Sequence, residues 1–270
     1  HLEARPRQGA RTVTPNPCAE IVRTRDPDRF LATMAAPPAA RAKLWPLYAL
    51  NLELARAAWV SAEPMVCLMR LQWWADVLGA MGPGTAPPAH EVAGPVHALV
   101  SGGVPGALLA GMAEARAWDA EAVPFRDEDD LRAYLDRTAG GLMWAAALAL
   151  GAPAPAEPVV RDFARGAGLA AWFCAAAELT DRGRMPLPDP SAEGTARLAR
   201  EGLAAIARAR RAGRSALPPA VRPALWAGWQ APALLEQAAR EPWRVAAGRL
   251  GLSEFRRRGG LLWRSLTGGV

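Results

Sequence analysis

The sequence predicts an all-α protein built as one domain. Valine and isoleucine never form the alternating runs that strands require, and proline and glycine divide the chain into helix-sized segments. Of the 270 residues 51% are hydrophobic and 21% are charged, which is too apolar for a disordered chain and enough for a substantial core. We find no repeat and no convincing linker. We therefore expect a poorly structured tail over residues 1–24 and one helical domain over residues 25–270.

Capping and proline signals predict the helices of the first half of the chain. Asp26 with Pro27 should begin the first of them, and Ser61 with Pro64 the third. Pro46 lies within the second and should kink it or mark its true start. The expected helices span about residues 25–36, 39–59, 61–81, 91–101 and 105–119.

The second half of the chain continues the helical pattern. Four consecutive acids, Asp127 to Asp130, precede an apolar run that extends to residue 152. Acids in a first helical turn act as caps and compensate the helix dipole, while a metal-binding cluster is the alternative interpretation. Capping is favoured because successive residues on a helix point in different directions. A further helix is expected at about 159–179, and residues 192–266 should form three or four shorter amphipathic helices.

The charged residues and the thiols exclude several classes of protein. The formal net charge is +6, and Lys43 is the only lysine, so almost all of the positive charge is arginine. Arginine is the usual reader of phosphate groups, but here it is scattered along the chain, and no nucleic-acid-binding motif appears. We expect no nucleic-acid partner. The odd number of widely spaced cysteines indicates buried thiols in a reducing compartment: Cys18, Cys67 and Cys174.

No segment predicts a membrane span or an ordinary catalytic motif. The most apolar stretches, residues 140–151 and 166–179, are shorter than the roughly 18 residues that a span needs. No secretory signal is expected, and the arginine-rich residues 1–17 are interpreted as an added or misassigned start, with a weak transit peptide as the alternative. Residues 255–266 mix arginine with leucine and tryptophan, as helices on membrane surfaces do, although two glycines interrupt them. We expect a cytoplasmic protein, at most peripheral at the inner membrane.

Four segments resemble the squalene/phytoene synthase family and occur in the family's order. They are "LYAL" at residues 47–50, "RLQWWADVL" at 70–78, "YLDRTAGGLM" at 134–143 and "RGRMPLP" at 182–188. The resemblance covers about residues 25–190. It implies the isoprenoid (terpenoid) synthase fold, a single helical domain around a central apolar cavity. In that family two aspartate-rich motifs hold Mg²⁺ against prenyl diphosphates, and the metal offsets the charge of the leaving group.

The expected metal-binding aspartates are missing from this sequence. Counting from the matched segments, the motif positions are held by Ala55, Arg56, Trp59, Ala175 and Leu179. An arginine in such a position repels Mg²⁺ and can bind phosphate unaided. The pattern more closely resembles a branch that includes a mitochondrial assembly factor for respiratory complex I and its bacterial relatives. That resemblance implies a non-catalytic role in assembly, with a protein partner and contact with the inner membrane surface.

Ten residues form the candidate anion-binding or cavity-lining site. Glu53 and Arg56, three residues apart on one helix, are equally well explained as a buried ion pair. Arg182 and Arg184 are also explained as caps of the preceding helix, and Trp73 and Trp74 as packing residues. The complete candidate set is Tyr48, Asn51, Glu53, Arg56, Arg70, Trp73, Trp74, Arg137, Arg182 and Arg184.

Three functions are compatible with these observations. The leading hypothesis is a non-catalytic assembly factor or adaptor that binds an isoprenoid or lipid and needs no cofactor. The second is an active prenyltransferase that holds Mg²⁺ with an altered set of acids: Glu53, Asp76, Glu178 and Asp181. The third is a helical interaction module without a cavity ligand.

Overall fold

The computed structural model describes residues 16–253 and residue 261. Within these residues the chain forms helices and no strand, so the predicted all-α fold is confirmed. The α-helices are α1 (Pro17–Arg25), α2 (Pro27–Met34), α3 (Pro38–Ala57), α4 (Pro64–Ala80), α5 (Ala93–Ser101), α6 (Gly106–Ala115), α7 (Ala117–Glu121), α8 (Glu128–Leu135), α9 (Gly141–Ala149), α10 (Glu157–Asp181), α11 (Ala192–Ala216), α12 (Ala231–Arg240) and α13 (Trp243–Ala246). A π-helix, η1 (Asp136–Gly140), joins α8 to α9, and two short 3-10 helices lie at Ala154–Ala156 and Arg222–Gly228.

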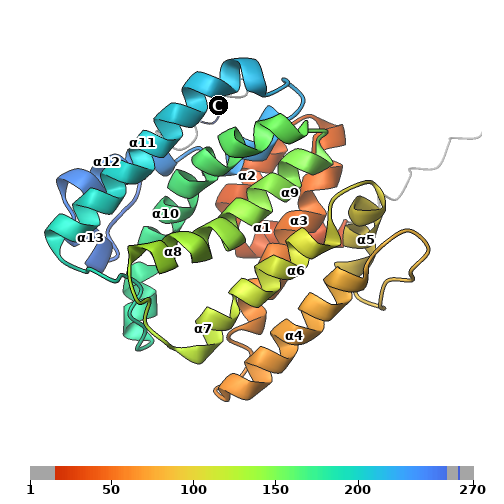
Figure 1. The fold of residues 1–270 in the computed structure, drawn as a ribbon, viewed down its shortest axis with the longest axis horizontal. Coiled ribbons are helices and arrows are strands. Elements are labelled where there is room, and N and C mark those ends of the chain that lie inside the picture. The colour runs from red at the N-terminus through yellow and green to blue at the C-terminus, as the bar shows by residue number, and fades with distance from the viewer. Residues whose placement is uncertain (1–15, 254–260, 262–270) are drawn as a thin grey trace, which may run out of the picture.

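Helix α10 is the central element of the arrangement. It packs along α11 on one side and contacts η1, α9 and α12 on others (Figure 1). Helices α4 and α6 pack together at the opposite edge of the molecule from α11. Glycine allows the closest of these contacts, because a Cβ atom built at Gly166 would lie 2.6 Å from the carbonyl oxygen of Gly202. Only hydrogen fits between the two backbones at this point.

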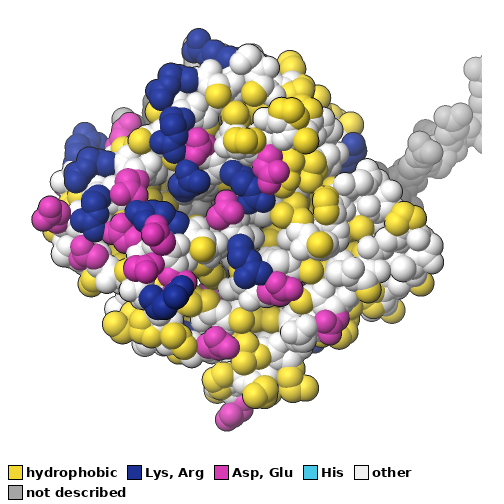
Figure 2. Space-filling view, in the orientation of Figure 1, with side chains coloured by type: hydrophobic (Ala, Val, Ile, Leu, Met, Phe, Trp, Pro, Cys, Tyr) yellow, Lys and Arg dark blue, Asp and Glu magenta, His cyan; other side chains and the backbone are white. Residues whose placement is uncertain are grey.

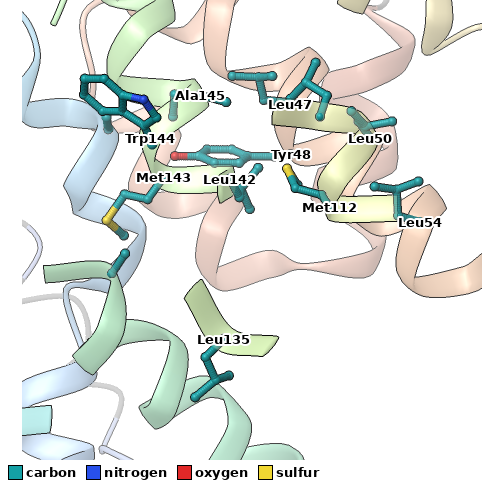
Figure 3. Close-up of a cluster of buried hydrophobic side chains, with 14 of the residues drawn as sticks. Leu47, Tyr48, Leu50, Leu54, Met112, Leu135, Leu142, Met143, Trp144 and Ala145 are labelled. Atoms are coloured by element: carbon teal, nitrogen blue, oxygen red, sulfur yellow. The ribbon is translucent and has the colours of Figure 1, made fainter. Parts of the chain in front are cut away.

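The hydrophobic core continues between α3, α6 and α9. Figure 3 shows Leu47, Tyr48 and Leu54 of α3 beside Met112 of α6 and the apolar residues of α9. Tyr48 is almost completely buried, and this burial raises the pKa of its hydroxyl group to about 12. The ring of Tyr48 therefore belongs to the core and stays neutral at physiological pH.

Helix α1 corrects the predicted domain boundary. The range 1–24 was expected to be poorly structured, but α1 begins at Pro17 and packs against α3. Asn16 caps α1 by accepting hydrogen bonds from the backbone of Cys18 and Ala19, and Cys18 and Val22 are fully buried. The prediction is wrong for residues 17–24, because Asn16 with Pro17 starts α1 by the same capping chemistry as Asp26 with Pro27 starts α2. Residues 1–15 lie outside the described part.

Three further differences concern helix lengths. Helix α3 continues through Pro46, so this proline does not mark its start. Helix α6 ends at Ala115, and α7 completes the segment that was expected as one helix at 105–119. The region after residue 192 begins with α11, a single helix of 25 residues and not a short one. The arginine-rich segment 255–266 lies outside the described residues except for Leu261.

Two surface properties of the described part are relevant to function. None of its helices combines the length and the apolar character that are needed to cross a bilayer. On the face drawn in Figure 2, charged side chains gather over α8, α10 and α11, whereas apolar side chains cluster at the lower tip where α4 begins. Several of the charged residues of these helices form ion pairs, as in Arg208 with Asp162 and Arg132 with Glu201.

Candidate functional site

A central cavity of about 370 Å³ lies where the long helix α10 faces α3, α7, α8 and η1. Its lining combines apolar side chains with several charged groups. The lining residues are Arg29, Asn51, Trp59, Arg116, Asp119, Tyr134, Leu135, Thr138, Ala139, Leu142, Gly168, Ala171, Trp172, Ala175, Glu178, Leu179 and Arg182.

A hydrogen-bond network centred on Asp119 forms the polar wall of the cavity. The Tyr134 hydroxyl donates to Oδ1 of Asp119 at 2.9 Å, and Nη1 of Arg116 donates to Oδ2 at 3.1 Å. Arg116 also donates from Nη2 to Oδ1 of Asn51 at 3.2 Å. Nη2 of Arg184 donates to the backbone oxygen of Asp119 at 2.7 Å. Each oxygen of the buried carboxylate therefore accepts a hydrogen bond, and the network as a whole joins four separate parts of the chain.

The network fixes the protonation of its members. Burial opposes the charge on Arg116, but Tyr134 and Asp119 outweigh this effect and raise the pKa of the guanidinium group. Burial, with a smaller contribution from Asp119, raises the pKa of Tyr134 far above its ordinary value, although Arg116 partly opposes the shift. Tyr134 therefore remains a hydrogen-bond donor and Arg116 remains a cation at any physiological pH.

Aromatic side chains form a second part of the wall. The rings of Trp118 and Phe125 are stacked, with centroids 4.2 Å apart, and both lie within 6 Å of Trp172. Tyr134 packs against Trp172 with a centroid distance of 5.1 Å. Nε1 of Trp172 donates to the backbone oxygen of Pro186 at 2.8 Å, which holds the loop after α10 against the cavity. This cluster gives the cavity a rigid apolar side.

The mouth of the cavity carries two guanidinium groups on one indole ring. The carbon atoms Cζ of Arg182 and Arg184 lie 4.8 Å and 4.9 Å from the ring centroid of Trp59. Arg182 also donates to Glu178 at 2.6 Å. Nε and Nη1 of Arg184 are buried and have no hydrogen-bond partner among the described residues, and the same is true of Nε of Arg29. Buried donors without a partner are rare and costly in proteins.

The π-helix η1 shapes the wall opposite α10. Its extra residue per turn brings Thr138 and Ala139 into the cavity lining, and Thr138 donates to the backbone oxygen of Tyr134 at 2.7 Å. A Cβ atom built at Gly168 would lie 2.6 Å from Cβ of Ala139. Helix α10 therefore approaches η1 closely only because residue 168 is glycine.

Comparisons with known proteins identify the family. The sequence profile of squalene/phytoene synthase matches residues 22–192, which is more than half of the chain. The chain belongs to the squalene/phytoene synthase family. A solved structure described as a dehydrosqualene synthase in complex with ligand is similar in fold, with a TM-score of 0.77 and 14% sequence identity over 93% of this chain and 95% of that chain. This likeness confirms the predicted isoprenoid synthase fold. No curated protein matches the chain.

The positions at which the resemblance expected the family's aspartates can now be located. Trp59, Ala175 and Leu179 line the cavity, which is where metal-binding side chains of a squalene/phytoene synthase would be needed. Ala55 is partly buried and does not line the cavity, and Arg56 is exposed. The cavity is thus present, but none of the three lining positions supplies a carboxylate.

Four of the ten candidate residues lie at or beside the cavity. Asn51 and Arg182 are lining residues, and Arg184 lies against Trp59 at the mouth. Tyr48 is a core residue, but its ring supports Arg29, whose Cζ atom lies 5.2 Å from the ring centroid.

The remaining candidates lie elsewhere. Glu53 is buried, but it pairs with Arg25 of α1 at 2.8 Å, so the expected pair with Arg56 is wrong. Arg137 is exposed and pairs with Glu114 at 2.7 Å. On α4, Arg70 and Trp73 are exposed, and Cζ of Arg70 lies over the ring of Trp73. Trp74 is fully buried, and its ring contacts that of His90 edge-on.

The alternative metal-binding acids do not come together. Glu53 is occupied by Arg25, Glu178 is occupied by Arg182, and Asp76 is exposed and accepts a hydrogen bond from Gln72. Asp181 is exposed and does not line the cavity. Throughout the described ranges there is no group of three or more histidine, cysteine or acidic side chains that could hold a metal ion, so the residues do not fit the Mg²⁺ that the family implies.

The acids at the start of α8 serve as caps. Asp127 accepts a hydrogen bond from the backbone of Asp130 at 2.8 Å, and Asp130 pairs with Arg126 at 3.0 Å. Arg126 lowers the pKa of Asp130 through this hydrogen bond. The placement fits the capping interpretation of these residues.

Sequence reasoning missed most of the polar wall. Tyr134 begins a segment that resembles the family, but its hydroxyl group was not singled out. Arg116 and Asp119 lie in "ARAWDAE", where nothing distinguishes them from an ordinary pair of charges on a surface helix. Arg29 was hidden within the first turns of a capped helix. Asp119 differs from an ordinary surface acid by its burial and its several hydrogen-bond partners. Both are properties of the fold, so the sequence pattern does not show them.

Proposed function

We propose that this protein is a non-catalytic member of the squalene/phytoene synthase family that binds an anionic, lipid-tailed ligand without a metal ion. One observation carries the proposal. The cavity is lined by three guanidinium groups, and each is paired with a carboxylate: Arg29 with Asp26, Arg116 with Asp119 and Arg182 with Glu178. Arg184 lies beside Arg182 on the ring of Trp59 and has no carboxylate partner among the described residues, so the charge that remains for a ligand at the mouth is positive.

The unpartnered donors support an anionic ligand. Nε of Arg29 and Nε and Nη1 of Arg184 are buried without a partner in the described part of the chain. Guanidinium groups bind phosphate through planar, parallel hydrogen bonds, and such bonds are stronger than bonds between neutral groups. A phosphate group beside Trp59 would supply acceptors for donors of this kind.

The shape of the cavity supports one ligand with an apolar tail. Leu135, Leu142 and Trp172 lie on the apolar side of the lining. The volume of about 370 Å³ lies near the lower end of the range of roughly 300–1,000 Å³ that is typical of small-molecule sites. Condensation of two prenyl diphosphates needs room for two chains and a metal that stabilises the leaving group. The paired acids and the small volume both favour binding over catalysis.

In the cell, we propose a role as an adaptor or assembly factor of the kind that the sequence resemblance implies, with respiratory complex I as the assembled target. The retained helical scaffold, whose cavity has no carboxylate at the three lining motif positions, supports this role. Deletion of the gene is expected to lower the amount of assembled complex I measured on native gels. Normal assembly in the deletion strain would overturn the role in assembly and leave the proposed ligand binding unaffected.

The ligand-binding proposal is tested by calorimetric titration. We expect farnesyl diphosphate to bind with the same affinity in Mg²⁺ and in EDTA. Replacement of a charged hydrogen-bond donor to the ligand weakens binding by roughly 1.5–3 kcal/mol, so Arg182→Ala should lower the affinity by about tenfold or more. Arg137→Ala is the matched control, since Arg137 is also paired with a glutamate but does not line the cavity.

Three results would contradict the proposal. Binding that requires Mg²⁺ would mean that the acids hold a metal in spite of their arginine partners. Formation of squalene, phytoene or dehydrosqualene by the purified protein would establish an active enzyme and overturn the non-catalytic part. Equal affinities in Arg182→Ala and Arg137→Ala would show that the ligand does not use the cavity mouth.

A further inference from the structure

An unusual cluster of exposed apolar side chains lies at the turn between α3 and α4. Within residues 60–73, Met65 is 65% exposed and Met69 is 66% exposed, and Val60, Val66 and Trp73 are also exposed. We refer to these five residues as the α4 tip. They make up half of the large apolar side chains that are exposed in the described part of the chain, so the clustering is not the ordinary scatter of single surface residues.

Four of the five residues of the α4 tip lie on α4, and Val60 lies in the turn before it. Met65, Met69 and Trp73 are spaced four residues apart, which aligns them along the outer side of α4. The inner side, with Cys67, Leu71, Trp74 and Leu78, is already buried against the protein. A helix that is apolar on both sides is normally covered on both, and no described element covers the outer side of α4.

The α4 tip adjoins the mouth of the central cavity. Val60 directly follows Trp59, which lines the cavity and carries Arg182 and Arg184 on its ring. The start of α4 projects at the lower end of the molecule in Figure 1, and Figure 2 shows apolar side chains on the surface there. If an apolar partner covers the α4 tip, a ligand with an apolar tail would pass from that partner into the cavity with little exposure to water.

The shape and chemistry of the α4 tip favour a bilayer as its partner. The tip projects, and its five residues line none of the larger hollows of the described surface, so it is suited to insertion and not to receiving a partner helix. Arg70 lies 5.8 Å from the ring of Trp73, and such an indole with a cation beside it is typical of the membrane–water interface.

We propose that the α4 tip inserts into the headgroup region of a lipid bilayer and that the cavity takes its ligand from that bilayer. This inference rests on the proposed binding of a lipid-tailed ligand. Within residues 56–76 the exposed arginines Arg56 and Arg70 are matched in number by the exposed acids Glu63 and Asp76, so this segment carries no net charge. Insertion of apolar side chains, and not attraction to anionic headgroups, supplies the binding. Vesicles of phosphatidylcholine alone should therefore be sufficient.

The test is flotation of the full chain with phosphatidylcholine vesicles. The wild-type protein should float with them. Met69→Asp should lower the partition coefficient by about tenfold, because it removes an apolar side chain that the bilayer would bury and adds a charge. Met34→Asp is the matched control, since Met34 is an exposed methionine on α2, a helix that lies away from the start of α4 in Figure 1, and this variant should float normally.

Each outcome decides the inference. Equal flotation of the wild type and Met69→Asp, or no flotation of the wild type, would overturn it. If sedimentation showed that the wild type forms a dimer and Met69→Asp a monomer, the α4 tip would be a self-association surface and the inference would be wrong. Titration of Met69→Asp with farnesyl diphosphate separates this inference from the proposed function. Unchanged affinity of Met69→Asp with lost flotation supports both, whereas a wild-type protein that floats but does not bind farnesyl diphosphate contradicts only the proposed function.

Discussion

Removal of the Arg25 side chain tests how the buried acid of α3 is neutralised. Glu53 has 8% of its side chain exposed, and Nη1 of Arg25 lies 2.8 Å from its Oε1 atom. In Arg25→Ala the carboxylate remains buried without its cation, and the structure becomes less stable. The cost lies between about 0.2–1 kcal/mol for an exposed pair and about 3–5 kcal/mol for a fully buried one. Because 40% of the arginine side chain is exposed, we expect a loss of about 2 kcal/mol.

Urea unfolding at neutral pH measures this loss directly. With a slope of about 2 kcal/mol per molar urea, the midpoint should fall by roughly 1 M while the slope stays constant. Arg56→Ala is the control, because Arg56 is the partner that the sequence spacing suggested, and it should change the free energy of unfolding by less than about 0.5 kcal/mol. In a Glu53→Gln background the effect of Arg25→Ala should shrink, with a coupling of about 1 kcal/mol or more.

Two results would show that Arg25 does not neutralise Glu53: a loss of stability in Arg56→Ala as large as that in Arg25→Ala, or an unchanged free energy of unfolding in Arg25→Ala. The first result would mean that the pair within α3 forms in solution. The second would mean that water or another group neutralises Glu53, and that α1 contributes packing but no charge.

Three other predictions concern packing, pH and metal ions. Gly166→Ala places a methyl group 2.5 Å from Cγ1 of Ile206 and should lower the free energy of unfolding in urea by about 1–3 kcal/mol. Gly94→Ala is the control: there is open space around its new Cβ atom, so it should be neutral or stabilising by up to about 1 kcal/mol. Equal effects of the two substitutions would refute the close contact of α10 with α11. Burial, with a contribution from Glu91, raises the pKa of the Cys18 thiol to about 11, so from about pH 9 to pH 11 the unfolded chain loses this proton while the folded chain keeps it. The free energy of unfolding should therefore fall with rising pH by roughly 2 kcal/mol more in the wild type than in Cys18→Ala, and parallel pH profiles would contradict this. EDTA should leave the melting temperature unchanged, because the described residues contain no group of acids that could bind a metal; a lower melting temperature in EDTA would reveal a bound ion.

Local signals in the sequence predict most of the helices, but they do not show which segments pack against the core. The asparagine–proline start of α1 uses the same capping chemistry as α2, but the arginines around it made the segment resemble a tail. Helix α11 was expected to be broken because its glycines look like punctuation. In the structure Gly202 faces Leu169 of α10, so it marks a close contact and not an end.

The candidate site was less accessible to sequence reasoning. Spacing along one helix suggested a partner for Glu53 three residues away, but the actual partner is 28 residues earlier in the chain. The contact of Arg116 with Asn51 spans 65 residues. Pairs of this kind are formed by the folding of helices onto one another, and no local periodicity encodes them. The family resemblance located the cavity because its motifs mark the helices that surround it.

The tryptophans give the protein two built-in optical reporters. The indoles of Trp118 and Trp172 lie 5.4 Å apart with their planes at 63°, and those of Trp73 and Trp74 lie 4.9 Å apart at 71°. Close, tilted chromophores couple their electronic transitions and produce paired bands of opposite sign in circular dichroism. The first pair includes a lining residue of the cavity, and the second includes the exposed ring of the α4 tip. Occupation of the cavity and contact with a bilayer therefore act on different chromophores, and the two events can be followed separately without any added label.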